Sequence, residues 1–95
     1  MVNLDVVPAP NPKVIGRIVN NEAVLVLPDI GKVKVLNEVG ARIWSLVDGT
    51  LSLRQIAALI CTEYQVSQAE AEADTQAFLD DLAGRGVVFL TGQPG

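Results

Sequence analysis

Histidine is absent from this 95-residue sequence, and cysteine occurs once, at Cys61. These two residue types supply most ligands of zinc and other transition metals, so the sequence predicts no such metal site. One cysteine cannot form a disulfide within the chain, and the apolar neighbours of Cys61 favour a packed thiol over a reactive one. Nucleophilic catalysis usually needs a histidine base. We therefore expect no catalytic residue and no cofactor.

Basic residues, aromatic residues and long apolar runs are also scarce. Seven Lys and Arg residues stand against eleven Asp and Glu residues, and the net charge of −4 disfavours binding to nucleic-acid phosphates. No apolar run approaches the roughly 20 residues that a membrane-spanning helix needs, and the first residues lack the basic and apolar regions of a secretory signal. We expect a cytoplasmic protein that binds neither nucleic acid nor membranes.

Apolar residues, at 49%, are frequent enough for one domain with a single, mainly aliphatic core. Three runs with strand character follow one another, at residues 13–20, 22–27 and 32–36. Asn20-Asn21 favours the positive φ of a hairpin turn, and residues 28–31 supply turn residues before the third run. Such short connections predict an antiparallel sheet with the third run at an edge.

Helical spacing of apolar residues predicts three helices after these strands, over residues 37–47, 52–65 and 67–84. Asn37, Ser52 and Ser67 are suitable N-caps, and Gln55 and Glu70 follow the two serines at capping-box spacing. The predicted fold class is α+β and winged-helix-like. It consists of a three-stranded antiparallel sheet followed by three helices that cover one sheet face.

The two ends of the chain are predicted to be less regular. The three prolines of residues 1–12 fix backbone angles and remove hydrogen-bond donors, so this segment is expected to be extended or flexible, with little regular structure. Residues 87–90 form an apolar run that is either a short strand or a tie-down, and residues 91–95 are expected to be a flexible tail. The predicted domain therefore spans residues 13–90.

The junction from Leu36 to Trp44 connects the third strand to the first helix. Before it, residues 32–35 alternate lysine and valine, the pattern of a strand with one buried face. From Asn37 onward the apolar spacing becomes helical, and Trp44, the only tryptophan, lies on the predicted buried side. We interpret the junction as scaffold, with Trp44 packed in the core to fix the corner between strand and helix.

The last two helices resemble a helix-turn-helix pair, so a winged-helix DNA-binding regulator is one functional alternative. A recognition helix presents Arg, Lys, Asn or Gln to base edges, whereas residues 67–85 carry five acidic residues and one basic residue, Arg85. This charge repels phosphate. A further alternative is an adaptor that binds a folded protein through the exposed sheet.

Peptide binding needs an unpaired strand edge, which residues 32–36 would provide. One flank of the third helix carries three carboxylates around a small residue: Glu70, Asp74, Ala77 and Asp81. As an acidic wall with an apolar notch, this flank would suit a peptide with a basic residue near apolar anchors; alternatively, it is simply a solvated helix face. Lys32 and Lys34 either block unwanted edge pairing or bind an acidic part of the peptide.

Several residues occur in the order of a known family signature: Leu36-Asn37, Gly40, Ile43-Trp44, Asp48-Gly49, Ile56-Ala57, Tyr64, Val66, Phe78-Leu79, Leu82 and Gly86. Over residues 13–88 the chain resembles the PqqD-like family. These are the leader-peptide recognition domains, or peptide chaperones, of ribosomally synthesised and post-translationally modified peptide pathways. The resemblance implies three strands followed by three helices, and capture of a leader segment as a strand added to residues 32–36.

By this resemblance, the peptide-binding residues belong to the edge strand and the adjoining flank of the third helix: Lys32, Val33, Lys34, Val35, Leu36, Glu70, Asp74, Ala77, Phe78 and Asp81. The implied partners are a precursor peptide and a modifying enzyme, such as a radical enzyme, a protease or a cyclase. Because the pocket residues vary among members, the resemblance identifies neither the peptide nor the pathway.

Overall fold

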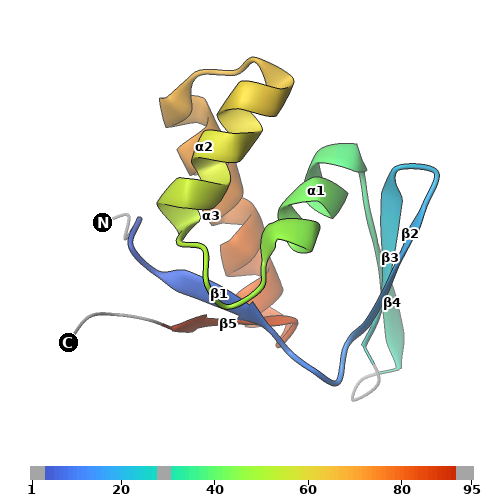
Figure 1. Cartoon of the computed structure of the whole chain (residues 1–95). Coiled ribbons are helices and arrows are strands. Elements are labelled where there is room, and N and C mark those ends of the chain that lie inside the picture. Colours follow the sequence, from blue (N-terminus) through green and yellow to red (C-terminus); the bar gives the residue numbers. More distant parts are fainter. Residues whose placement is uncertain (1–3, 28–30, 92–95) are drawn as a thin grey trace.

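The computed structural model describes residues 4–27 and 31–91. Its elements, in chain order, are β1 (Val7–Pro10), β2 (Ile15–Val19), β3 (Glu22–Leu27), β4 (Lys32–Leu36), α1 (Glu38–Leu46), α2 (Leu53–Tyr64), α3 (Gln68–Gly84) and β5 (Val88–Thr91) (Figure 1). β2, β3 and β4 form an antiparallel sheet in that order, and β1 pairs with β5. The predicted α+β class is confirmed. Residues 28–30 of the predicted turn and residues 92–95 of the predicted tail lie outside the described residues.

A two-residue turn at Asn20 and Asn21 joins β2 to β3. Both residues have positive φ, 53° and 65°, the conformation that asparagine tolerates in a type I′ hairpin turn. Val19 consequently pairs with Glu22. On the other side of β3, β4 occupies one edge of this sheet, as predicted.

Side chains cap the three helices where the sequence predicts. Asn37 and Ser67 each accept a hydrogen bond from the backbone N–H three residues later, at 2.9 and 3.1 Å. Ser52 and Gln55 form a complete capping box. These bonds satisfy N–H groups that the first turn of a helix leaves without partners.

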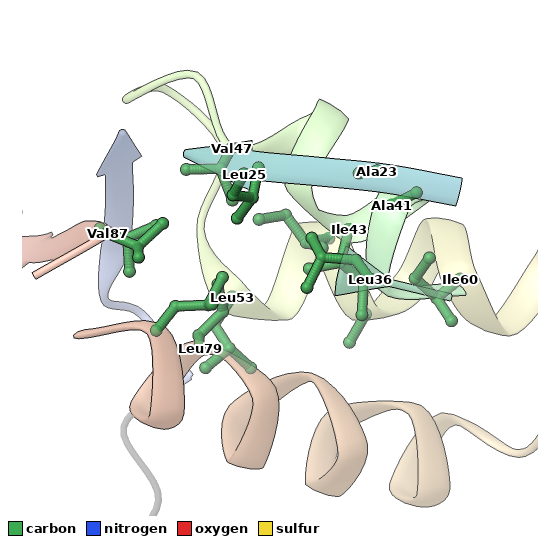
Figure 2. Packing of buried hydrophobic residues seen from close by; sticks show 14 of the residues in the cluster. Ala23, Leu25, Leu36, Ala41, Ile43, Val47, Leu53, Ile60, Leu79 and Val87 are labelled. Carbon is green, nitrogen blue, oxygen red and sulfur yellow. The ribbon is translucent and has the colours of Figure 1, made fainter. Parts of the chain in front are cut away.

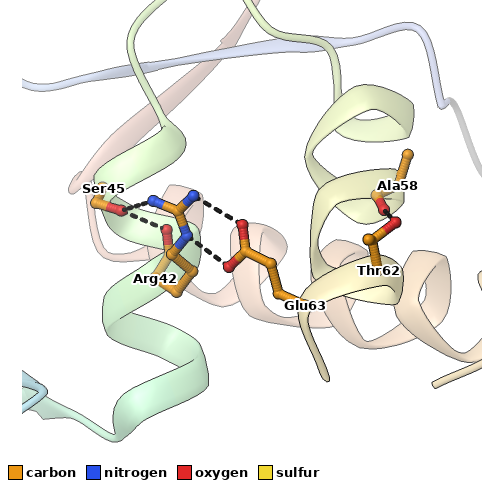
Figure 3. A network of polar contacts seen from close by, with 5 residues as sticks. All are labelled: Arg42, Ser45, Ala58, Thr62 and Glu63. Carbon is orange, nitrogen blue, oxygen red and sulfur yellow. Dashed lines mark hydrogen bonds and ion pairs between the residues drawn. The ribbon is translucent and has the colours of Figure 1, made fainter. Parts of the chain in front are cut away.

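The helices form a layer behind the sheet. α1 packs on β3 and β4, whereas α2 and α3 pack mainly on each other (Figure 1). The expected cover of the sheet face by three helices therefore comes chiefly from α1. Arg42 of α1 donates from two nitrogens to the two carboxylate oxygens of Glu63 on α2, at 2.8 Å each, and so joins these helices (Figure 3).

One hydrophobic core connects the sheet and the helices. Leu25 of β3, Leu53 of α2 and Leu79 of α3 are all buried, and Figure 2 shows such side chains pointing toward one another from the three elements. Burying a leucine side chain contributes about 1.5–3 kcal/mol. The core therefore holds β3, and with it the neighbouring edge strand, in a fixed place beside the helices.

Trp44 lies elsewhere than predicted. It is half-buried against the core, and its Nε1 atom would lie 2.8 Å from a Cβ placed on Gly16 of β2. The indole thus covers the inner face of the sheet at β2, not the corner between β4 and α1. Gly16 makes this possible because the absence of a side chain leaves room for the ring.

The N-terminal segment is more regular than predicted. The expectation of little regular structure before residue 13 is wrong for residues 7–10, because β1 pairs antiparallel with β5, with Pro8 opposite Leu90. A short edge strand tolerates the missing N–H of proline. The same pairing shows that residues 88–90 are a strand and not merely an apolar tie-down.

The residues around β1 also complete the start of α2. The N–H groups of Leu53 and Arg54 donate to the carbonyl oxygens of Val6 and Leu4, at 2.8 and 2.9 Å. The Val6 side chain is only 8% exposed. The segment thus supplies partners to a helix terminus and a side chain to the core.

Among the described residues, no helix is long and apolar enough to cross a membrane.

Candidate functional site

The free edge of β4 offers the backbone groups of two valines. The pair that closes the hairpin, Val19 and Glu22, is of the hydrogen-bonded kind, and the two kinds of pair alternate along an antiparallel ladder. Glu22 therefore directs its backbone groups to β2, as do Val24 and Val26. The residues between and after them, Ala23, Leu25 and Leu27, direct their backbone groups to β4. Their partners on β4 are Leu36, Lys34 and Lys32. The N–H and C=O groups of Val33 and Val35 consequently point to the free edge.

The side chains of β4 face the opposite way from the prediction. Val33 and Val35 are each 60% exposed on the outer face of the sheet, whereas Leu36 is 3% exposed. Because side chains alternate along a strand, Lys32 and Lys34 share the inner face with Leu36. The alternation of lysine and valine implies a strand that buries its valines, and this implication is wrong because Leu36, which packs in the core, decides which face is inside.

The outer face of the sheet is apolar across its three strands. In the ladder, Val26 of β3 lies between Ile15 of β2 and Val33 of β4. All three side chains are exposed. Contiguous exposed apolar side chains of this kind are typical of an interaction surface.

Lys34 connects the edge strand to α3. Its Nζ atom lies 3.5 Å from Asp81 Oδ2, and Arg85 Nε donates to the same oxygen at 3.0 Å. Two cations therefore share one carboxylate. Arg85 is not among the predicted site residues, although its spacing of four from Asp81 on a helix is a recognisable signal for such a pair.

The cations around Asp81 stabilise its charged form. The hydrogen bond from Arg85, together with the charges of Arg85 and Lys34, lowers the pKa of Asp81 below its ordinary value. Because the folded pKa is lower than the unfolded one, the carboxylate contributes stability above the ordinary pKa of about 3.9. That contribution is lost as the pH falls through the lowered pKa.

Arg85→Gln is expected to raise the pKa of Asp81 toward its ordinary value, because the substitution removes the hydrogen bond with the largest effect. An NMR titration of the Asp81 carboxyl carbon measures this change. Arg54→Gln is the control, because Arg54 pairs with Asp5 at 3.6 Å instead. An unchanged Asp81 pKa in Arg85→Gln would show that the pair does not form in solution.

Gly40 allows α1, α3 and the end of β4 to approach one another. A Cβ placed on Gly40 would lie 3.1 Å from Phe78 Cε1 and 3.3 Å from Leu36 Cβ. Leu36 and Phe78, both predicted site residues, therefore meet at this glycine. The contact places the middle of α3 beside the C-terminal end of β4.

Gly40→Val is expected to lower the free energy of unfolding by about 1–3 kcal/mol, because the added side chain overpacks the contact with Phe78. Urea denaturation measures the loss. Gly84→Val is the matched control, since a Cβ placed on Gly84 meets no atom within 4 Å. Equal losses in the two variants would contradict the proposed role of close packing at Gly40.

The structure brings together only part of the predicted site. Lys34 pairs with Asp81, and Leu36 comes close to Phe78. α3 therefore runs in the direction opposite to β4, so earlier residues of α3 lie toward the C-terminal end of β4. Ala77, one residue before Phe78, is exposed. Glu70 and Asp74 are also exposed, and by this direction they lie past the C-terminal end of β4. The predicted acidic wall is thus divided, and its Asp81 is already paired.

A hollow of about 270 Å³ lies on another side of α1, lined by Ile18, Asn21, Glu38, Ala41, Arg42, Ser45 and Tyr64. None of the predicted site residues lines it.

Cys61 is half-buried, and its thiol donates to the Val66 carbonyl at 2.9 Å. Within the described ranges, no three or more His, Cys, Asp and Glu side chains form a group that could hold a metal ion.

Comparison with protein families adds to this geometry. The family model described as coenzyme PQQ synthesis protein D (PqqD) matches residues 22–88, which run from the start of β3 to the first residue of β5. The chain belongs to the PqqD family. The resemblance in the sequence is thereby confirmed, and the match covers β4, Gly40 and the whole of α3.

Three solved structures share the PqqD-family fold of this chain. TbiB1 in complex with the TbiA(beta) leader peptide is 29% identical, with a TM-score of 0.81 over 90% of this chain and 99% of that chain. The PqqD truncation of Methylobacterium extorquens PqqCD is described as a functional, stand-alone recognition element for ribosomally synthesised and post-translationally modified peptides. It is 30% identical, with a TM-score of 0.73 over 90% and 89% of the two chains.

The third structure is lasso peptide synthetase B1 complexed with the leader peptide. It is 23% identical, with a TM-score of 0.78 over 87% of this chain and 98% of that chain, and it supports the fold alone. Comparison with curated proteins gave no match.

Proposed function

We propose that this PqqD-family chain binds the leader segment of a ribosomally made precursor peptide as a strand added to β4, and presents it to a modifying enzyme. The observation that carries the proposal is the free edge of β4, where the backbone groups of Val33 and Val35 point away from β3. The likeness to TbiB1, solved with a leader peptide, supports it.

The proposed contacts divide between backbone and side chains. Val33 and Val35 offer hydrogen-bonding groups, while Lys32, Lys34 and Leu36 line the inner face of β4. Phe78 and Asp81 of α3 border that face, and Ala77 adjoins them. Glu70 and Asp74 would contact only a peptide that continues past the end of β4.

The proposed role is non-catalytic. The relative from M. extorquens is described as a stand-alone recognition element, which supports binding without catalysis. The enzyme that receives the peptide would be a radical enzyme, a protease or a cyclase. The cytoplasm remains the expected location.

NMR titration tests this function. The isotope-labelled chain is mixed with synthetic leader segments of the small precursors encoded beside its gene. We expect backbone amide shifts concentrated in β4 and the facing side of α3. If a leader bound with shifts confined to other elements, or none bound at high concentration, strand addition at β4 would be wrong.

The apolar outer face of the sheet favours one other candidate function, an adaptor that binds a folded protein through Ile15, Val26 and Val33. An adaptor would bind the modifying enzyme equally well with and without precursor peptide. A leader-presenting protein instead links precursor to enzyme, so enzyme capture of the precursor should depend on this chain. A pull-down with all three components separates the two functions.

DNA binding is disfavoured by the exposed carboxylates of α3.

A further inference from the structure

We propose that the peptide strand bound at β4 presents an acidic side chain, Asp or Glu, opposite Lys34. This inference rests on the proposed function and specifies the chemistry of its ligand. It follows from the direction of the β4 backbone and from the ion pairs between β4 and α3.

The proposal takes the peptide strand as antiparallel to β4, and hydrogen-bonded and non-hydrogen-bonded pairs alternate along such a ladder. Since Val33 and Val35 offer the hydrogen-bonding groups, the peptide residue opposite Lys34 forms a non-hydrogen-bonded pair with it. Residues in such pairs approach more closely, with Cα atoms about 4.5 Å apart instead of about 5.5 Å. Both side chains lie on the inner face, where Lys34 reaches Asp81 of α3 at 3.5 Å. The peptide side chain therefore lies directly beside Lys34.

The charges at this position favour an acid. Lys34 and Arg85 share the single carboxylate of Asp81, so the three groups carry one net positive charge. Lys32 adds a second positive charge on the same face of β4. Opposite charges across a strand pair are stabilising and like charges are destabilising. A peptide lysine opposite Lys34 would meet repulsion that a glutamate would not.

This preference is opposite to the one that an acidic wall predicts. A basic peptide residue would need a free carboxylate beside β4, but Asp81 Oδ2 already accepts a bond of 3.0 Å from Arg85. Glu70 and Asp74 lie past the end of β4. The acidic wall and the acidic ligand predict opposite effects of Asp81→Asn on peptide affinity. The acidic wall predicts weaker binding, and the acidic ligand predicts tighter binding.

The probe is a displayed library of random short peptides, selected in parallel against the full chain and against Lys34→Glu. We expect the full chain to enrich Asp or Glu at one position of the selected peptides, and Lys34→Glu to enrich Lys or Arg there. Lys13→Glu is the charge-matched control, because Lys13 precedes β2 at the other edge of the sheet. It should select the same acidic residue as the full chain.

The tightest selected peptide then serves in a double-mutant cycle. Its acidic residue is changed to lysine, and both peptides are titrated by fluorescence anisotropy against the full chain and Lys34→Glu. Each like-charged combination should bind about fivefold to tenfold more weakly than the oppositely charged ones. Asp81→Asn should tighten binding of the acidic peptide, because it leaves Lys34 and Arg85 without their carboxylate.

The outcomes separate the inference from the function on which it rests. Two outcomes would overturn the acidic-ligand inference for a peptide that binds at the free edge of β4. One is that the charge preference does not invert in Lys34→Glu, and the other is that Asp81→Asn weakens binding. If the library yields no peptide whose binding is weakened in Val33→Pro or Val35→Pro, strand addition at β4 itself is wrong.

Discussion

Proline at Val33 or Val35 is expected to weaken leader-peptide binding by about tenfold to a hundredfold. Each substitution removes an N–H that points to the free edge and leaves a peptide carbonyl without its partner, at a cost of about 1–3 kcal/mol. The β3–β4 ladder should be spared, because its bonds come from Lys32, Lys34 and Leu36. Isothermal titration with a leader that binds the unmodified chain measures the loss.

Two controls separate edge pairing from general damage to the sheet. Val33→Thr keeps the backbone N–H and the β-branched shape, so peptide affinity should change little. Ile18→Pro removes an N–H that points outward on β2, at the opposite edge of the same sheet. It too should leave peptide affinity intact. If Ile18→Pro weakened binding as much as the β4 variants, while circular dichroism showed an intact fold, the site at β4 would be wrong.

Removal of residues 1–10 is expected to lower the free energy of unfolding by at least about 4 kcal/mol. Burial of the Val6 side chain contributes about 1.5–3 kcal/mol, and each hydrogen bond to a carbonyl of this segment contributes about 1 kcal/mol. Leu53 and Arg54 of α2 and Gly49 before it donate such bonds. The total free energy of unfolding of a small domain is about 5–15 kcal/mol, so this loss would be a large part of it. Urea denaturation of the two chains measures the difference.

Val6→Ala and Val7→Ala provide a matched pair for this prediction. Val6 is buried and Val7 is half-buried, so the first substitution should destabilise the chain more than the second. An N-terminally shortened chain with an unchanged unfolding midpoint would mean that β1 does not contribute to the stability of the fold.

Features set by neighbouring residues could be predicted from the sequence. Asn20 and Asn21 specify the turn between β2 and β3 through their own backbone preferences, and Ser52 with Gln55 specifies the start of α2. The short turn then requires adjacent strands, which places β4 at an edge. Each step involves only nearby side chains and covalent connection, so no distant contact is needed to decide it.

Features set by distant residues could not be predicted. β1 forms because it pairs with β5, some 80 residues later in the chain. The prolines near β1, considered alone, predicted little regular structure. The place of Trp44 depends on the space over Gly16. At the candidate site, Lys34 and Asp81 were both predicted, but their pairing depends on the packing of α3. The same packing separates Glu70 and Asp74 from the strand edge.

The alternation along β4 divides the proposed site between two sets of residues, and this division affects how such proteins can diverge. Val33 and Val35 direct their backbone groups to the edge, whereas Lys32 and Lys34 direct their side chains to α3. Side-chain substitutions at the lysines leave every main-chain group at the edge in place. At the proposed site, evolution can therefore exchange one peptide ligand for another without altering the main chain of the edge strand. Two solved structures that are 29% and 30% identical to this chain share its fold.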